Sequence, residues 1–383
     1  MKILIIHRSF ALVGGAERVI IDKANYLSNK GHEVILVSYE QGQHPLPYVL
    51  QSNVKHIDLN CRFFTLTKYS ILFQLFKFFD LKWKLRTILK QTISDYCPDV
   101  VILASDWQFL IKTVLYAAGS LPVIAEFHNA YDFITKKIGV VDNGIKSRLT
   151  SLYYRSSLKY FKQCTCLVSL TENDARHWRN HSEHVVVIPN PVTVYPDSIP
   201  NVLKEEGRII CVGRLNDQKR IDRLVTAFAK IALKYPIWHV DVFGEGDRKS
   251  ALQEQIRSCN LQDRFIIHEP TKNIYDEYKR SQFLVLSSAY EGRPLVLVEA
   301  MACGLPCVSF NCPSGPAEII DNEVTGLLAR NGDVDDLSAK IEWMITHDIE
   351  RKEMGDKAYM AAAIYRPSNI MKEWENLYTR FSK

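Results

Sequence analysis

Short runs of aliphatic and β-branched residues alternate with longer amphipathic segments along all 383 residues of the chain. This alternation is typical of a parallel β-sheet covered by helices. The chain is long for a single hydrophobic core, so its length favours two domains. Prolines and turn residues interrupt the alternation from Pro189 to Pro200, where we place a hinge. The sequence therefore predicts an α/β protein with two parallel sheets in series.

The apolar runs define the strands that we expect. In the first half they are Lys2–His7, Glu33–Ser38, Asp99–Ala104, Pro122–Phe127, Cys166–Ser169 and Val185–Ile188. In the second half they are Arg208–Val212, His239–Phe243, Phe265–His268, Phe283–Ser287 and Pro306–Phe310. The first amphipathic segment predicts a helix from about Ala16 to Asn29, because Gly31 follows it as a stop signal.

The charge balance is mildly basic, with 48 lysine and arginine residues against 43 acidic residues and a formal net charge of +5. This excess is compatible with an anionic ligand or an anionic lipid surface, but it is too small to indicate nucleic-acid binding. The apolar run at Met1–His7 is too short for a signal sequence, and no run approaches the roughly 20 apolar residues that span a bilayer. We therefore expect any membrane contact to be peripheral.

The cysteines are odd in number, nine, and several lie in apolar runs, as Cys211 and Cys307 do. This pattern favours reduced core thiols in a cytoplasmic protein over a disulfide framework. The groups Cys164 with Cys166 and Cys303 with Cys307 and Cys312 lack the paired two-residue gaps of zinc sites. No metal site is expected from the cysteines.

Segment 62–90 is unusually rich in aromatic and basic residues. If it is helical, one face carries Phe78, Leu81, Leu85 and Ile88, and another carries Lys82, Arg86 and Lys90. Helices that lie on anionic membranes or meet a lipid-linked acceptor have this pattern. A core helix with a solvated basic side has it too, and both interpretations stay open.

Two adjacent glycines, Gly14 and Gly15, follow the first predicted strand and precede the first predicted helix. Glycines let the backbone approach a ligand closely, and a helix N-terminus offers free N–H groups to an anion. The dinucleotide fingerprint Gly-x-Gly-x-x-Gly is absent. The pair is therefore either a binding turn or only a tight connection.

Two cations follow the first predicted strand of the second half. That strand ends at Gly213, and Arg214 and Lys219 precede a helix that is expected to begin near Arg220. They should project from the carboxyl edge of the sheet, where open α/β sheets bind ligands. Two cations at this edge can neutralise a diphosphate, and the alternative for either one is ordinary surface charge.

The stretch from Ser287 to Ala302 has a strand that runs into a Glu-Gly turn and then a helix. Pro294 suits the first helical turn, and the backbone N–H groups of Leu295 and Val296 would be free to meet phosphate. The preceding turn contains Gly292. This backbone predicts an anion site.

Glu291 and Glu299 lie at the two ends of this turn and helix, with seven residues between them. A carboxylate can accept hydrogen bonds from two hydroxyls of a polyol, so the pair suits a sugar at one end and a ribose at the other. For Glu299 alone, a salt-bridged helix glutamate is the simpler interpretation.

Two further positions need an interpretation. His128 stands just beyond a predicted strand of the first half, where an imidazole could meet a departing or attacking oxygen, although such a histidine is more often structural. Asp333 and Asp335 form an Asp-x-Asp pair, but Asp333 directly precedes a helical pattern, so we interpret it as a helix cap and not as a metal ligand.

Taken together, these motifs resemble the retaining glycosyltransferases of family four, which have the GT-B fold, and the resemblance runs nearly from end to end. It depends on the Gly14-Gly15 turn, Gly213-Arg214-Leu215 with Gln218-Lys219, the Glu291 and Glu299 pair, and the run from Glu299 to Pro306. The last two are specific and the first is weak. The family has glycine after the lysine, where this chain has Arg220.

The resemblance implies two Rossmann-like domains that face each other across a cleft. Residues 1–190 would bind the acceptor, residues 191–366 the nucleotide sugar, and residues 367–383 would form a helix that crosses back to the first domain. The donor would be a nucleotide diphosphate sugar, with UDP-hexose or UDP-N-acetylhexosamine favoured. The acceptor would be a glycan or a polyprenyl-diphosphate-linked saccharide in bacterial surface polysaccharide synthesis.

The resemblance also implies a role for each candidate residue. Glu291 would contact donor-sugar hydroxyls, Glu299 the ribose, Arg214 with Lys219 the diphosphate, His128 the reacting sugar, and Gly14 and Gly15 the donor from the first domain. Gly292, Leu295 and Val296 would complete the donor site. Transfer would retain anomeric configuration without a metal or a cofactor, while the two cations stabilise the leaving diphosphate.

Two alternatives remain at this stage. A sugar-nucleotide epimerase of the same fold would act on the donor without an acceptor. A membrane-associated partner of another transferase would have no catalysis of its own. We expect a cytoplasmic protein, with contact at the inner face of the cell membrane through 62–90 as the open question.

Overall fold

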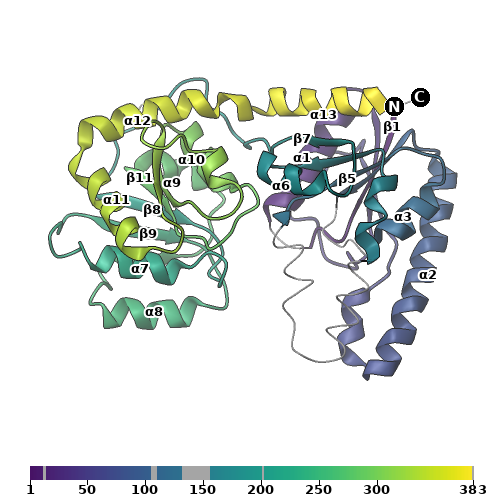
Figure 1. The fold of residues 1–383 in the computed structure, drawn as a ribbon, viewed down its shortest axis with the longest axis horizontal. Coiled ribbons are helices and arrows are strands. Elements are labelled where there is room, and N and C mark those ends of the chain that lie inside the picture. The colour runs from purple at the N-terminus through teal and green to yellow at the C-terminus, as the bar shows by residue number, and fades with distance from the viewer. Residues whose placement is uncertain (12–13, 105–109, 132–155, 201, 382–383) are drawn as a thin grey trace. The chain divides into compact units, whose positions relative to one another are not determined.

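The computed structural model describes residues 1–383 except 12–13, 105–109, 132–155, 201 and 382–383. The chain divides into two units. The first contains Met1–Pro189 together with Met371–Lys383, and the second contains Asn190–Ile370. Each unit is built on a parallel sheet with helices packed on it (Figure 1).

The first unit has seven described strands, in the order β3-β2-β1-β4-β5-β6-β7. They are β1 (Lys2–His7), β2 (Glu33–Ser38), β3 (Lys55–Asp58), β4 (Val100–Ala104), β5 (Val123–Glu126), β6 (Cys166–Ser169) and β7 (Val185–Val187). The helices are α1 (Gly15–Asn29), η1 (Phe63–Lys68), α2 (Ile71–Tyr96), α3 (Ile111–Ala118), η3 (Phe161–Gln163) and α6 (Glu172–Trp178), and the unit also contains the end of α13 (Pro367–Phe381). Residues Ile3 to Ile6 of β1 are almost fully buried, because helices cover both faces of the sheet.

The second unit has six described strands, in the order β10-β9-β8-β11-β12-β13. They are β8 (Arg208–Val212), β9 (His239–Phe243), β10 (Phe265–His268), β11 (Phe283–Leu286), β12 (Cys307–Phe310) and β13 (Gly326–Ala329). The helices are α7 (Ile221–Ala229), α8 (Lys249–Ser258), α9 (Ile274–Arg280), α10 (Leu295–Ala302), η4 (Pro316–Glu318), α11 (Val334–Thr346), α12 (Asp348–Ala361) and η5 (Ala362–Tyr365).

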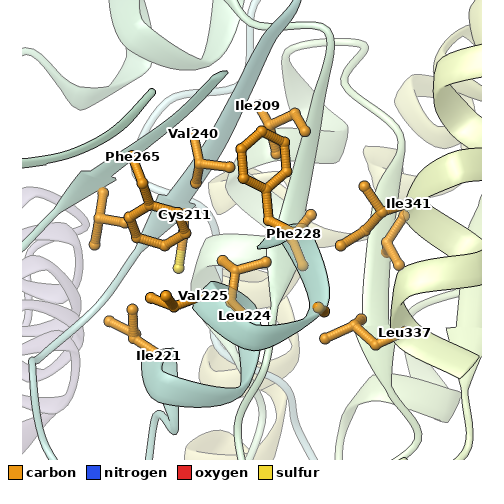
Figure 2. Packing of buried hydrophobic residues seen from close by; sticks show 14 of the residues in the cluster. Ile209, Cys211, Ile221, Leu224, Val225, Phe228, Val240, Phe265, Leu337 and Ile341 are labelled. Atoms are coloured by element: carbon orange, nitrogen blue, oxygen red, sulfur yellow. The ribbon is translucent and has the colours of Figure 1, made fainter. Parts of the chain in front are cut away.

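The core of the second unit shows why α7 is a helix in this place. Ile221, Leu224, Val225 and Phe228 recur at helical spacing and point together from α7 into the core (Figure 2). They meet the sheet and α11, through Ile209, Cys211, Val240, Phe265, Leu337 and Ile341. This packing fixes the loop between β8 and α7 at the carboxyl edge of the sheet.

The eleven strands predicted from the sequence are confirmed, with ends that differ by one residue at most. Two strands were missed. Lys55–Asp58 is a short edge strand with mostly polar, half-exposed side chains, so it lacks the apolar run of a central strand. Gly326–Ala329 begins with a glycine, which the sequence pattern assigns to a turn; here a Cβ would lie 2.3 Å from the carbonyl oxygen of Cys307.

Segment 62–90 forms η1 and most of α2. The apolar face predicted from the sequence packs against the core of the first unit, where Leu85 is buried and Phe78, Leu81 and Ile88 are partly buried. The core-helix interpretation is therefore confirmed for this face. A second set of apolar side chains on α2, Phe73, Leu75, Phe76, Phe79 and Trp83, is exposed.

Several smaller expectations are also settled. All nine cysteines are free thiols and seven of them are buried. The carboxylate of Asp333 accepts hydrogen bonds from the backbone N–H groups of Asp335 and Asp336, so it caps α11 as predicted. Among the described residues, no helix combines the length and the apolar character that crossing a membrane requires.

Candidate active site

The strand order of the second sheet places two loops side by side. The chain passes from β8 to β9 on one side of the sheet and from β11 to β12 on the other side. The direction in which the strands are added therefore reverses between the neighbouring strands β8 and β11. The carboxyl edge at such a reversal is where open α/β sheets bind ligands. The loops that leave this edge are 213–220 and 287–294.

Hydrogen bonds from backbone and side-chain donors to backbone carbonyl oxygens join these two loops. The Ala289 N–H donates to the Gln218 carbonyl oxygen at 2.8 Å, and the Gln218 side-chain amide donates to the Tyr290 carbonyl oxygen at 3.1 Å. The Ser287 hydroxyl donates to the Lys219 carbonyl oxygen at 3.0 Å. The position of each loop therefore depends on the other.

Lys219 and Glu291 meet where the loops join. The Lys219 Nζ lies 2.7 Å from Glu291 Oε1, in a charge-assisted hydrogen bond, and both side chains are largely shielded from solvent. The sequence named both residues as candidates, and the structure brings them into contact. Gly315, at φ +97°, supports this turn, because a Cβ there would lie 2.7 Å from the Gly292 carbonyl oxygen.

Arg214 belongs to the same loop as Lys219 and is exposed. It lies two residues after the end of β8 at Val212, so it stands at the carboxyl edge of the sheet. The region thus holds one cation paired with a buried carboxylate and a second cation exposed to solvent.

Arg220 does not join these two cations. Its guanidinium binds the Asp222 carboxylate, with Nη2 2.7 Å from Oδ2 and Nε 2.9 Å from Oδ1. The Arg220 backbone is in the left-handed region, at φ +47° and ψ +44°, directly before α7. Glycine adopts this conformation without strain, which is a physical reason for glycine at this position in the family that the chain resembles.

The helix α10 begins one residue later than its proline suggested. Pro294 is the N-cap residue, with extended backbone at ψ 104°, and the helix starts at Leu295. The proline side chain has no acceptor atom, so the cap gives the N–H groups of the first turn no side-chain partner. The N–H groups of Leu295 and Val296 belong to this turn, where α-helices have no partners of their own for their N–H groups.

Glu299 is held by a tyrosine from the neighbouring helix α9. The Tyr278 hydroxyl donates to Glu299 Oε2 at 3.1 Å, and the Tyr278 side chain is fully buried. Burial, and then the charge of Glu299, raise the pKa of Tyr278 well above its ordinary value, so the phenol stays a donor. Nothing in the local sequence of Glu299 indicates this partner, which lies 21 residues earlier.

The first unit places Gly14, Gly15 and His128 at the carboxyl edge of its own sheet. Gly14 is the N-cap residue of α1, and its carbonyl oxygen accepts a hydrogen bond from the Tyr48 hydroxyl at 3.2 Å. His128 follows the end of β5, and its imidazole is 5% exposed. Its Nε2 lies 3.5 Å from Oε2 of Glu126.

A buried ion pair next to His128 was not foreseen. Lys23 of α1 is fully buried, and its Nζ donates to both carboxylate oxygens of Glu126, at 2.5 and 2.6 Å. Burial alone would raise the pKa of Glu126, but the Lys23 ammonium and the contact with His128 outweigh it and hold this pKa at about 2. Glu126 is therefore ionised at neutral pH.

Family models match the chain on both sides of the boundary between its two units. Residues 13–194 match Glycosyltransferase Family 4 and residues 197–360 match Glycosyl transferases group 1. With the two Rossmann-like sheets and the site above, these matches define the class: the chain belongs to the family-four glycosyltransferases of the GT-B fold.

Individual proteins similar to the chain agree with this assignment. The amylovoran biosynthesis glycosyltransferase AmsD of Erwinia amylovora is 24% identical over 98% of this chain and 99% of its own length. An alpha-1,4-N-acetyl-D-galactosaminyltransferase of Campylobacter jejuni, named for an acceptor on PP-undecaprenol, is 24% identical over 95% of this chain and 94% of its own length. A mutant of S. aureus TarM, crystallised with fondaparinux, alpha-GlcNAc-glycerol and UDP, shares the fold at a TM-score of 0.77 and 14% identity, over 98% of this chain and 99% of TarM.

Proposed function

We propose that this glycosyltransferase moves a sugar from a nucleotide diphosphate sugar to a saccharide acceptor, with retention of anomeric configuration, in the synthesis of a surface polysaccharide or glycoconjugate. The observation that carries the proposal is the Lys219–Glu291 pair at the strand-order reversal of the second sheet, beside the N-terminus of α10. A cation, a carboxylate and free backbone donors in one place match a sugar joined to a diphosphate.

Each group has a chemical role in this proposal. The Lys219 ammonium and the Arg214 guanidinium stabilise the negative charge that builds on the leaving diphosphate. Glu291 accepts hydrogen bonds from hydroxyls of the donor sugar, and its contact with Lys219 fixes the carboxylate before the donor binds. Because these two cations and the helix N-terminus supply the positive charge, the proposed reaction requires no metal ion and no cofactor.

Glu299 and Tyr278 form the proposed ribose end of the site. The Tyr278 hydroxyl donates a hydrogen bond to Oε2 of Glu299 and so orients the carboxylate. This carboxylate would accept hydrogen bonds from the ribose hydroxyls. On the first unit, His128 is proposed to meet the reacting sugar, and Gly14 and Gly15 to approach the donor. Residues 1–190 would then bind the acceptor and residues 191–366 the donor.

The donor and acceptor are proposed from the similar proteins. UDP is present with TarM, so we propose a UDP-sugar, either a hexose or an N-acetylhexosamine. The name of the C. jejuni protein includes a saccharide on PP-undecaprenol, so we propose a polyprenyl-diphosphate-linked saccharide as acceptor. With such an acceptor, we propose that the reaction takes place at the inner face of the cell membrane.

Helix α2 is the proposed membrane contact, on a different face from the one the sequence suggested. Phe76, Phe79 and Trp83, which we call the aromatic stripe, are 58 to 68% exposed and recur at spacings of three and four residues, so they lie on one helix face. Segment 62–90 has seven basic residues and one acidic residue, Asp80. Exposed aromatic side chains with basic neighbours suit an anionic lipid surface.

A two-stage experiment tests the proposal. Nucleotide sugars are first screened for an increase in the melting temperature of the protein, because a ligand that binds only the folded state stabilises it by mass action. The stabilising donor is then incubated with a polyprenyl-diphosphate saccharide, and the product is measured by mass spectrometry. We expect a mass increase of one sugar residue.

Variants make this test specific. Lys219→Ala and Glu291→Gln should abolish product formation, whereas Lys234→Ala, which breaks an exposed pair with Glu342 in the same unit, should not change it. Conversion of the donor in the absence of acceptor would instead indicate an epimerase. Unchanged transfer by the Lys219 and Glu291 variants would overturn the proposed site.

A further inference from the structure

The pair Lys23–Glu126 is buried without an evident need for charge. Lys23 lies on the core-facing side of α1 among Val19, Ile20, Ala24 and Leu27, where an apolar residue would pack. Taking a lysine and a glutamate out of water is costly, and an apolar pair of similar size is often at least as stable. A buried ion pair in this place therefore calls for a role beyond stability.

The C-terminal helix α13 supplies two of the groups around this pair. The Lys23 Nζ lies 3.8 Å from the ring centroid of Trp374, and the Tyr378 hydroxyl donates to Glu126 Oε1 at 3.2 Å. Both aromatic side chains are buried, and they lie one helical turn apart. Glu126 Oε1 thus accepts from Lys23 and Tyr378, while Oε2 accepts from Lys23 and faces His128.

The histidine at the end of this network is incompletely bonded. Both ring nitrogens of His128 are buried, and neither has a hydrogen-bond partner among the residues that the structure describes. The separation of 3.5 Å between its Nε2 and Glu126 Oε2 is longer than a normal hydrogen bond, but it brings an ionised carboxylate to one nitrogen only. A carboxylate is an acceptor, so it favours the tautomer with the proton on Nε2 and leaves Nδ1 as the acceptor.

We propose that Glu126 is a positioning residue for His128, and that α13, through Tyr378 and Trp374, holds the Lys23–Glu126 pair in the geometry that this positioning requires. The last helix of the chain then acts on the histidine through two intermediate side chains. This inference depends on the proposed role of His128 near the reacting sugar.

The test uses two variants of the full-length protein. Tyr378→Phe removes one donor to Glu126 but leaves Lys23 paired, so the variant should fold. Lys23→Met with Glu126→Gln removes both charges together and leaves no unpaired ion in the core. Thr379→Val is the matched control, because it removes a hydroxyl from the exposed neighbouring position of α13.

The first measurement is independent of activity. In protein with labelled histidine, the imidazole nitrogen signals of His128 are identified by their loss in His128→Gln. We expect both test variants to shift these signals towards a mixture of tautomers and the control to leave them unchanged. Unaltered His128 signals in both test variants would overturn the inference.

The second measurement separates positioning from binding. We expect Tyr378→Phe to lower kcat by about tenfold, and the double variant to lower it by about 100-fold, since small displacements of a group at the reacting centre have effects of this order. The donor KM should change less than twofold, because the proposed contacts to the diphosphate and the ribose, Arg214, Lys219 and Glu299, lie on the second unit and are unaltered in these variants. If His128→Gln lowers kcat but both variants keep the kcat of wild type, the inference is overturned. If the signals move and His128→Gln itself keeps full activity, the proposed role of His128 fails while the positioning stands.

Discussion

The buried pair between Lys23 and Glu126 allows a prediction whose size can be worked from the structure. Lys23→Met keeps the volume of the side chain but leaves the Glu126 carboxylate, 2% exposed, without its cation. Removing one partner of a buried ion pair costs about 3–5 kcal/mol. Burial opposes the ionised form of Glu126, and the Lys23 ammonium outweighs it and holds the pKa of Glu126 low, so the buried carboxylate depends on its cation.

Differential scanning calorimetry measures the effect. A loss of about 3–5 kcal/mol should lower the melting temperature by roughly 6–20 °C, since 1 kcal/mol shifts a unit of this size by about 2–4 °C. The double variant Lys23→Met with Glu126→Gln should recover at least half of this loss, because no buried charge is left unpaired. Lys77→Met, which breaks a largely exposed pair with Asp80, is the control and should cost at most about 1 kcal/mol.

The pH dependence has a defined sign. The folded-state pKa of Glu126 lies below its ordinary value, so the stabilisation is fully present above about pH 4.5 and is lost as the pH falls towards 2. On the acid side, the difference in stability between wild type and Glu126→Gln should therefore shrink within this window. If Lys23→Met melted like the Lys77 control, or if the double variant lost the sum of the two single changes, the reasoning about the buried charge would be refuted.

Three further predictions concern other parts of the chain. Arg220→Gly should leave the donor KM within twofold of wild type and the free energy of unfolding within about 1 kcal/mol. The substitution relieves the strain of a left-handed backbone and loses only the ion pair with Asp222. A tenfold rise in the donor KM would place Arg220 in the donor site. Tyr278→Phe should raise the donor KM several-fold with kcat unchanged, since Glu299 loses its orienting donor, and an unchanged KM would limit Tyr278 to packing. Serine at all three positions of the aromatic stripe should weaken flotation with vesicles of anionic phospholipid but not transfer to a water-soluble acceptor; equal flotation would refute the membrane contact.

The strands were predictable because their residues carry the information locally. Runs such as Ile3 to Ile6 are apolar on both faces, as strands of a doubly covered parallel sheet must be. Lys55–Asp58 has no such run, because an edge strand pairs on one side only. For segment 62–90 the sequence analysis considered a helix, but the segment has two sets of apolar side chains, and sequence periodicity alone does not say which set faces the core.

The candidate site likewise contains some contacts that the sequence predicted and others that it did not. Lys219 and Glu291 each follow a strand that ends at the same sheet edge, so sequence and strand order together bring them close. Lys23 and Glu126 are 103 residues apart, and nothing in the sequence around either residue indicates the other as its partner. The partner of Glu299 was hidden for the same reason, because a tyrosine in an amphipathic helix gives no indication of what its hydroxyl meets.

The central claim is that Lys219 and Glu291 hold the diphosphate and sugar of the donor. Calorimetric titration of the nucleoside diphosphate of the stabilising donor into wild type, Lys219→Ala and Lys234→Ala tests it most directly. We expect Lys219→Ala to raise the Kd at least tenfold, as for the loss of a charge-assisted contact worth about 1.5–3 kcal/mol, and Lys234→Ala to bind like wild type. Equal Kd values for wild type and Lys219→Ala would contradict it.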